Sequence, residues 1–239
     1  MTDLQANTAT LHATIDVARR VERAEIEFCA LAGATSASID VCDVAGGRAL
    51  FSRAGSPLNK VLGLGLFGPV TDDDLHRIEK FYGTRGVPTQ IELCPLAYGD
   101  LAARLCARGY VLEAFENELG MLLAGAPDAK PLTIEQMIGM MSQFGHPKID
   151  RYVAWVDGEP AGGGAAWAHE GVVGIFGTAT LPRFRRRGVQ AAITLQAMED
   201  ARGRADLAIA TTAPGSTSQR TFERLGYRVL YTRAVFLKS

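Results

Sequence analysis

Cysteine and histidine are both scarce in this sequence, and neither is arranged as a metal or redox site requires. The chain has four of each, and no two cysteines have the close spacing of a zinc-binding or disulfide-exchange pair. We therefore expect no metal site, and free, buried thiols at the cysteines. The cysteines are Cys29, Cys42, Cys94 and Cys106.

Long apolar runs and an excess of one charge are missing as well. No stretch reaches the ~18 uninterrupted apolar residues of a membrane-spanning helix, and the opening "MTDLQANTATLHATID" lacks the basic and apolar regions of a signal peptide. A formal net charge of −1 gives the chain no general attraction to nucleic acid or to an acidic membrane. We therefore expect a cytoplasmic protein without a nucleic-acid or membrane partner, in which any basic site is local.

The composition is that of a folded globular protein. Hydrophobic residues make up 47% and charged residues 21% of the 239 residues, which is enough to bury a core in one large or two small domains. Only "AGAPDAKP", residues 124–131, has the alanine, proline and glycine content of a linker. We therefore predict two domains, residues 1–125 and residues 131–239.

Segments with helical spacing alternate with short strand-like segments, so the predicted fold class is α/β with a mixed sheet. Thr71, Thr133 and Ser216 stand where residues that cap helices are expected. The predicted helices span residues 11–32, 71–83, 96–109, 133–145, 188–203 and 216–226. The predicted strands span residues 38–44, 60–67, 89–94, 110–123, three antiparallel stretches within 151–182, then 205–212 and 227–237.

The two halves of the chain resemble each other. "LCARGYVLEAF" and "FERLGYRVLYT" align at Gly109 and Gly226, and "GLGLFGP" and "GIFGTATLP" align at Pro69 and Pro182 with nearly the same offset. Two landmarks at similar offsets indicate a duplicated unit.

The stretch "LPRFRRRGVQAA", residues 181–192, combines three arginines and a glycine at the start of a predicted helix. Free backbone N–H groups gather there at the positive end of the helix dipole. Gly188 lets an anion approach the backbone, and the arginines add charge and forked donors. The pattern therefore predicts a site for a phosphate or pyrophosphate group.

This stretch resembles the acetyl-CoA pyrophosphate loop of the GNAT N-acetyltransferase superfamily. The family pattern runs Arg or Gln, two residues, Gly, one residue, then Gly or Ala, and Gln190 departs from it at the last position. The resemblance extends over most of 131–239 and implies a splayed strand at "GIFGTATL" and a pantetheine-facing position at Ser218. It implies that acetyl-CoA is bound by Thr178, Thr180, Leu181, Arg185, Arg186, Arg187, Gly188, Val189, Gln190, Ala191, Ala192 and Ser218.

The resemblance leaves the catalytic groups open. Many family members carry a tyrosine acid four residues before the glycine of the Gly-aromatic pair, and here that position is Phe222. Ser218, Thr221 or a bound water could replace it, or the thiolate could leave unassisted. No acid stands in "GIFGTATL", where members often place a base, and His169 and Glu170 are expected to form an exposed turn.

The first half contains a rival motif, "GLGLFG", which matches a dinucleotide-binding fingerprint. The helix after it opens with Asp72, Asp73 and Asp74, which would repel a pyrophosphate, so we favour a packing role for the glycines. If the two halves are duplicates, "PVTDDDLHRIEK" in the first half occupies the place that the arginine loop "PRFRRRGVQAAI" occupies in the second half. We therefore predict a degenerate GNAT-like first half without cofactor binding, which instead shapes the substrate cleft or a dimer surface.

The sequence as a whole predicts two GNAT-like acyl-CoA N-acyltransferase units in tandem. The expected reaction moves an acetyl group from acetyl-CoA to an amine of a small molecule or peptide. A non-catalytic acyl-CoA-binding or sensing protein is the main alternative, and an NAD-dependent enzyme is a second one. Whether the chain forms a homodimer is left open.

Overall fold

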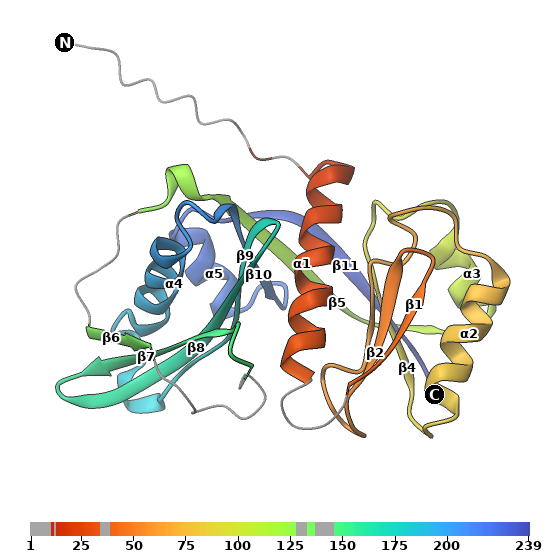
Figure 1. Ribbon diagram of the computed structural model, residues 1–239, viewed down its shortest axis with the longest axis horizontal. Coiled ribbons are helices and arrows are strands. Elements are labelled where there is room, and N and C mark those ends of the chain that lie inside the picture. Colours follow the sequence, from red (N-terminus) through yellow and green to blue (C-terminus); the bar gives the residue numbers. More distant parts are fainter. Residues whose placement is uncertain (1–10, 12, 34–38, 128–132, 137–145) are drawn as a thin grey trace, which may run out of the picture.

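A computed structural model of the chain describes residues 11, 13–33, 39–127, 133–136 and 146–239. It is built around one mixed sheet with helices packed on both faces (Figure 1). The helices are α1 (Ile15–Gly33), α2 (Asp72–Gly83), α3 (Leu101–Ala107), η1 (Leu123–Gly125), η3 (Pro182–Phe184), α4 (Val189–Asp200) and α5 (Thr217–Arg224). The strands are β1 (Asp40–Val44), β2 (Gly47–Phe51), β3 (Val61–Leu62), β4 (Thr89–Leu93), β5 (Val111–Leu122), β6 (Thr133–Gln136), β7 (Asp150–Val156), β8 (Glu159–His169), β9 (Gly171–Thr180), β10 (Ala205–Thr212) and β11 (Arg228–Lys238).

The α/β prediction is confirmed, and one predicted helix is wrong where the structure describes it. Thr133 does not cap a helix, because residues 133–136 form β6 and pair antiparallel with β7 from Trp155 to Tyr152. A free strand edge at β7 overrides the local helical spacing in this stretch. The remainder of that predicted helix, residues 137–145, lies outside the described residues.

Two further differences concern strands of the first half. β2 pairs with β1 as a hairpin that the sequence reading missed. The strand predicted over 60–67 shrinks to β3, since Gly63 and Gly65 adopt positive φ angles of 71° and 77° and turn the chain away from the sheet.

The strand order shows that the two halves exchange their last strands. The sheet runs β1-β2-β3-β4-β11-β5-β10-β9-β8-β7-β6, so β11 of the second half lies beside β4, and β5 of the first half lies beside β10. β5 and β11 also pair with each other along most of their length. Each half therefore completes the sheet of the other.

The turns that precede the exchanged strands are the same in both halves. The N–H of Gly109 donates to the carbonyl oxygen of Cys106, and the N–H of Gly226 donates to that of Glu223, both at 3.0 Å. The two glycines have φ angles of 87° and 104°, which only glycine adopts easily. This shared geometry supports the duplication inferred from the sequence.

Helix α1 covers one face of the sheet across both halves. Neighbouring residues of a strand point to opposite faces: Val61 packs with residues of α2 and α3, whereas Leu62 packs with α1. In the second half Val173 packs with α4 and α5, and Val172 packs with α1. Figure 1 shows α1 crossing the middle of the molecule between the strands of the two halves.

A buried ion network lies under α1 where the exchanged strands meet. Its centre is Arg233 of β11, which is fully buried. The guanidinium lies within ion-pair distance of four carboxyls of the first half, Glu22 (2.8 Å), Glu25 (2.6 Å), Glu92 (3.5 Å) and Glu118 (2.9 Å). These contacts connect the second half to the first electrostatically.

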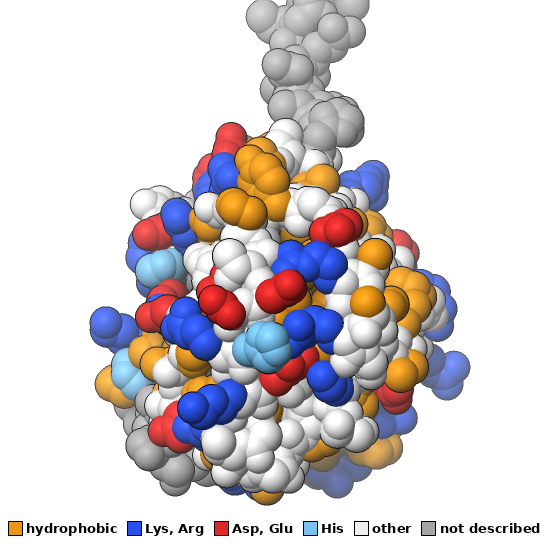
Figure 2. Space-filling model, turned by 90° about the vertical axis from the view of Figure 1, so that its right-hand side faces the viewer, with side chains coloured by type: hydrophobic (Ala, Val, Ile, Leu, Met, Phe, Trp, Pro, Cys, Tyr) orange, Lys and Arg blue, Asp and Glu red, His pale blue; other side chains and the backbone are white. Residues whose placement is uncertain are grey.

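Charges on the outer face of the first half alternate in sign, as Figure 2 shows for the end of the molecule that carries α2 and α3. Arg104 pairs with Asp72 and Arg108 pairs with Glu79 there. No helix among the described residues is long and apolar enough to cross a membrane.

The four cysteines are free, as expected, but they are not all buried: Cys29 and Cys94 are buried, Cys42 is half-buried and Cys106 is exposed. Within the described ranges no cluster of His, Cys, Asp and Glu could hold a metal ion.

Candidate functional site

The site begins where β9 and β10 separate. The two strands pair in parallel only as far as Gly174 and Ile209, after which β10 continues beside β5. Beyond Gly174, no strand of the described residues pairs with the edge of β9 that faced β10. The resemblance predicted a splayed strand at this position.

A bulge in β9 sharpens the separation. Gly177 and Thr178 together stand opposite Gly164 of β8, and Gly177 has a φ of 59°. Bulges with a glycine in this conformation bend a strand and redirect its side chains. The bulge brings Thr178 to the place where the two cavities described below meet.

Helix α4 starts without a side-chain cap. Its N-cap is Gly188, with a φ of 80°, and no side chain in the described part of the chain caps the first turn. By contrast, Thr71 caps α2 and Ser216 caps α5 through their side chains. The N–H groups of the first turn of α4 are thus available to an anion, supported by the helix dipole.

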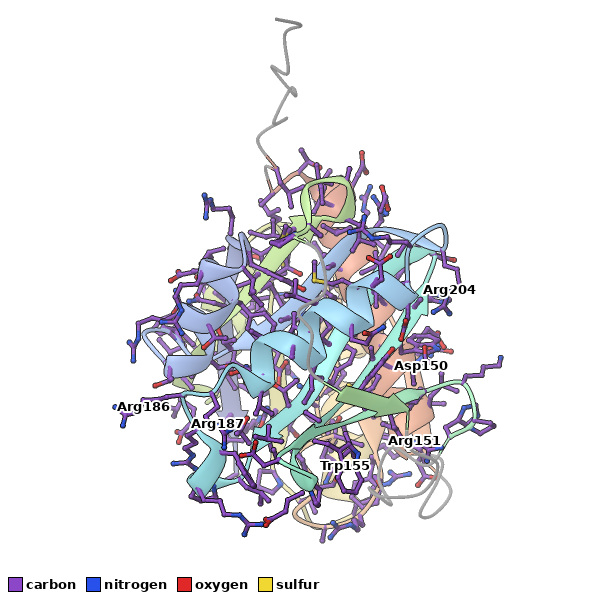
Figure 3. The ribbon with its side chains drawn as sticks, turned by 90° about the vertical axis from the view of Figure 1, so that its left-hand side faces the viewer. Asp150, Arg151, Trp155, Arg186, Arg187 and Arg204 are labelled. Carbon is purple, nitrogen blue, oxygen red and sulfur yellow. The ribbon has the colours of Figure 1, made fainter. Side chains whose placement is uncertain are left out.

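A cavity of about 790 Å³ opens in front of this helix end, and we call it the loop cavity. Arg185 and Arg186 of the loop and Arg224 of α5 line it, and no acidic residue is among the described residues of its wall. Figure 3 shows Arg186 extending outward at the edge of the molecule. The cavity is therefore suited to a group with several negative charges.

Most residues expected to bind acetyl-CoA come together at the loop cavity, and four do not. Those in its wall are Thr178, Thr180, Arg185, Arg186, Gly188, Val189, Gln190 and Ala191. Arg187 instead pairs with Asp157 at 3.0 Å, Leu181 is exposed and Ala192 is buried in the core. Ser218 lies in the wall of a neighbouring cavity.

Sequence reasoning missed Arg224, although the spacing of α5 contained a signal. Thr217, Thr221 and Arg224 are separated by four and three residues, so they lie on one face of a helix, and all three line the loop cavity. The Arg224 Nη2 donates to Thr221 Oγ1 at 3.1 Å, which orients the guanidinium beside the cavity.

The neighbouring cavity measures about 380 Å³ and lies between the two halves, so we call it the interhalf cavity. Its wall combines Glu25 and Phe28 of α1 and Glu116 of β5 with Phe176 of β9 and Phe222 of α5. Thr178 lines both cavities. A molecule reaching along the separated strands from the loop cavity would therefore arrive here.

Gln190 bridges the boundary of the two cavities. Its Nε2 donates to Thr178 Oγ1 at 3.2 Å and to Ser218 Oγ at 2.9 Å. The residue that departs from the family pattern thus links β9, α4 and α5.

The catalytic candidates lie on different sides of this boundary. Thr221 lines the loop cavity, and its hydroxyl donates to the carbonyl oxygen of Thr217 at 3.0 Å. Ser218 lines the interhalf cavity together with Phe222, which is 2% exposed and packs edge-on against Tyr227. Phe222 brings no hydroxyl to the cavity, and Ser218 is the candidate that Gln190 connects to Thr178 at the junction.

The interhalf cavity contains a carboxyl that sequence reasoning did not single out. Glu116 Oε2 is buried and has no hydrogen-bond partner among the described residues. Burial is the main cause that raises the pKa of Glu116, and the charge of Glu92 adds to the effect. No local motif marks this glutamate, because β5 reaches the site only through the strand exchange.

The glycine-rich stretch of the first half has a packing role. Leu64 and Leu66 are buried, and a Cβ at Gly65 would approach Leu101 and Ala97 to 3.3 Å. The N-terminus of the following helix is already closed by Thr71 and Asp74, which cap each other's backbone N–H groups. These contacts favour the structural interpretation of "GLGLFG" over a dinucleotide site.

Comparison with known proteins agrees with this geometry. Residues 122–227 match the sequence model of the Acetyltransferase (GNAT) family. No curated protein matches the chain as a relative. The match spans β9, the arginine loop, α4, β10 and α5, which carry the loop cavity and the splayed strands.

Three solved structures share the fold over nearly the whole chain. A GCN5-related N-acetyltransferase from Kribbella flavida has a TM-score of 0.73 at 20% identity and covers 93% of this chain and 95% of its own. A tandem GNAT protein from the clavulanic acid biosynthesis pathway has a TM-score of 0.59 at 14% identity, and the match covers 95% of this chain and 96% of that protein. A GCN5-related N-acetyltransferase from Sphaerobacter thermophilus has a TM-score of 0.57 at 12% identity, and the match covers 95% of this chain and 94% of that protein.

The comparisons confirm the predicted fold class, a mixed α/β sheet of GNAT type, and agree with two units in tandem. The family match shows that residues 122–227 are similar to the GNAT family, and the solved structures show the shared fold.

Proposed function

We propose that the chain is a GNAT-type N-acetyltransferase, which takes an acetyl group from acetyl-CoA and transfers it to an amine of a small molecule or peptide. The observation that carries the proposal is the uncapped N-terminus of α4 facing the loop cavity, with Arg185, Arg186 and Arg224 in its wall. N–H groups and arginines directed at one cavity suit a pyrophosphate. The structure of the tandem GNAT protein from the clavulanic acid biosynthesis pathway is one without AcCoA, which names this molecule as a ligand to consider.

The described residues fit such a molecule. A Cβ built on Gly188 meets no atom within 4 Å, so the space beside the loop backbone is open. The free edge of β9 beyond Gly174 offers backbone N–H groups to an amide-containing arm and to a carbonyl oxygen. Acetyl-CoA would supply a thioester whose carbonyl carbon bonds to the amine nitrogen as its bond to sulfur breaks, the nitrogen losing a proton and the sulfur gaining one.

Ser218 is the side chain best placed to serve the leaving sulfur. In its hydrogen bond with Gln190 (2.9 Å) Ser218 Oγ only accepts, so its own proton is free to be donated whether that hydrogen bond is closed or open. Thr221 is the weaker candidate, because its proton is already directed to the carbonyl oxygen of Thr217.

The first half, residues 1–125, is proposed to be a degenerate GNAT-like unit without a cofactor loop. The acids that replace the arginines are occupied locally, Asp72 with Arg104 and Asp74 with Thr71. The N-terminus of α2 is therefore capped by its own side chains and lined by carboxylates, which disfavour a pyrophosphate. In this proposal the first half contributes walls to the substrate site of the second, residues 131–239.

Acetyl-CoA is expected to raise the melting temperature of the full chain, whereas NAD should leave it unchanged. Release of free thiol in the presence of an amine would support transfer. Tight binding without thiol release for any amine would favour the alternative of an acyl-CoA-binding or sensing protein, which the apolar Phe222 makes reasonable. No effect of acetyl-CoA on melting would contradict both.

A further inference from the structure

The interhalf cavity has walls from both halves of the chain. Half of its described residues come from the first half, from α1, the segment before β3, and β5. Its other wall comes from β9, β10 and α5, and Thr178 connects it to the loop cavity. At about 380 Å³ it has the size of a small-molecule site.

One wall of this cavity is aromatic. The rings of Phe28 and Phe176 stack with their centroids 3.5 Å apart, and Phe222 stands in the same cavity wall. Ring faces and edges of this kind attract flat apolar groups, and they also tolerate a nearby cation. The aromatic wall therefore suits the apolar body of a ligand.

The cavity wall also contains the carboxyl of Glu116, whose buried Oε2 has no hydrogen-bond donor among the described residues. Four charged groups on other elements face it: Glu25 on α1, Lys60 before β3, Glu92 on β4 and Arg233 on β11. Each of these has an ion-pair partner within the network, including Lys60 with Glu92 at 3.0 Å and Arg233 with Glu25 at 2.6 Å.

Glu116 is thus the carboxyl for which the network provides no ion pair among the described residues. A buried carboxyl oxygen without a donor is unfavourable, and a charged N–H donor would relieve that cost. The surroundings hold more carboxyl than cationic groups even with Glu118 protonated, since Glu22, Glu25, Glu92 and Glu116 face only Lys60 and Arg233. This balance favours a cationic ligand and disfavours an anionic one.

We propose that the interhalf cavity is the acceptor site, and that the acceptor is a primary ammonium ion attached to an aromatic or other apolar body, with its nitrogen held by Glu116. The body lies against Phe28 and Phe176, and the nitrogen lies toward Thr178, where the two cavities meet. This inference rests on the proposed function and adds to it the class of acceptor and a role for the first half.

A binding measurement tests the acceptor site without depending on the transfer reaction. Calorimetry on the full chain with phenethylammonium and with 2-phenylethanol, which has the same body without the charge, should show much tighter binding of the ammonium ion. Glu116→Gln should weaken ammonium binding at least about 10-fold, because a charge-assisted hydrogen bond is lost, and leave the alcohol unchanged. Glu113→Gln is the matched control, since Glu113 lies on the same strand with its side chain exposed.

Steady-state kinetics provide the second readout. With acetyl-CoA saturating, Glu116→Gln should raise the KM for phenethylamine at least about 10-fold, while the Kd for acetyl-CoA and the melting temperature stay close to those of the unaltered chain. Glutamate, an anionic amine, should be a poorer acceptor than phenethylamine.

The outcomes distinguish the two proposals. Equal binding of phenethylammonium by the unaltered chain and Glu116→Gln, or faster acetylation of glutamate than of phenethylamine, would overturn the acceptor inference and leave acetyl transfer standing. Binding of phenethylammonium that depends on Glu116, without thiol release from acetyl-CoA for any amine of a panel, would support an ammonium-binding site at Glu116 and overturn the transfer together with the acceptor role of that site.

Discussion

Gln190 Nε2 donates a hydrogen bond to Ser218 Oγ at 2.9 Å, and this contact crosses the boundary between the loop cavity and the interhalf cavity. A pantetheine arm that follows the free edge of β9 has to pass the same boundary at Thr178. The bridge therefore stands in the path that the proposed function requires.

Gln190→Ala should bind acetyl-CoA more tightly than the unaltered chain. The substitution removes two hydrogen bonds, to Thr178 and Ser218, that would otherwise have to open, each with a net contribution of about 1 kcal/mol. We expect the Kd measured by calorimetry to fall by up to about 30-fold. Gln196→Ala is the control, because Gln196 lies on the same helix and bonds to Asp200 away from both cavities.

Weaker binding by Gln190→Ala would show instead that the amide contacts the bound molecule directly. The two results have opposite signs, so one titration decides between a bridge that opens and a binding contact.

Gly188→Glu should abolish or strongly weaken acetyl-CoA binding. The side chain would enter open space beside the loop and bring a negative charge to the proposed pyrophosphate position. Gly203→Glu is a matched control, because Gly203 has a nearly equal φ of 78° and likewise no atom within 4 Å of a Cβ, yet it lies outside the loop cavity. Both variants should lose about 1–2 kcal/mol of stability from the strained backbone.

Calorimetric Kd values and melting temperatures measured on both variants separate the two effects. Equal acetyl-CoA affinity in Gly188→Glu and Gly203→Glu would sink the assignment of the loop as the pyrophosphate site.

The free energy of unfolding should fall as the pH rises, because Glu118 in the buried network has to release a proton. Burial raises the pKa of Glu118 to about 8, against the opposing charge of Arg233. In the unfolded chain the same carboxyl titrates near 4.5, so between these values the folded state holds a proton that the unfolded state has released. The contribution of Glu118 to stability is therefore complete below about pH 4.5 and is lost as the pH rises through about 8.

Urea unfolding at several pH values measures this effect. Glu118→Gln keeps the shape of a protonated glutamate, so its free energy of unfolding should decline less between about pH 6 and pH 9. Glu113→Gln, exposed on the same strand, should decline as the unaltered chain does. An equal decline in all three proteins would show that Glu118 does not carry the proton.

Local patterns predicted the parts of the site that are contiguous in the sequence. The arginine loop, Gly188 and the start of α4 lie within a few residues, and their backbone geometry follows from neighbouring residues alone. Arg187 shows the limit of this reasoning, because its pairing with Asp157 depends on a turn between β7 and β8. No periodicity distinguishes it from Arg186, which lines the cavity.

The acceptor side could not be predicted in this way. Glu116 reaches the cavity because β5 lies beside β10, and Phe28 reaches it because α1 crosses both halves. These placements come from pairings between strands far apart in the chain, which local propensity does not encode. The sequence similarity between the halves indicated a duplication but not the exchange of the last strands.

The exchange predicts that residues 131–239 will not fold cooperatively when expressed alone. Without the first half, β10 loses β5 as its neighbour, and β11 loses both β4 and β5. Arg233 would also lose all of its carboxyl partners, which lie in the first half, and an unpaired buried charge costs about 3–5 kcal/mol. Circular dichroism during heating should show no sharp transition for this fragment.

Coexpression with residues 1–130 should restore both the cooperative transition and acetyl-CoA binding, because the missing strands and carboxyls return without a covalent link. Arg233→Met in the fragment supplies the control: it removes the unpaired charge but not the need for β5, so it should not rescue folding. A sharp transition in the unaltered fragment alone would mean that β11 can pair with β10 directly, and that the exchange is not required for the second half to fold.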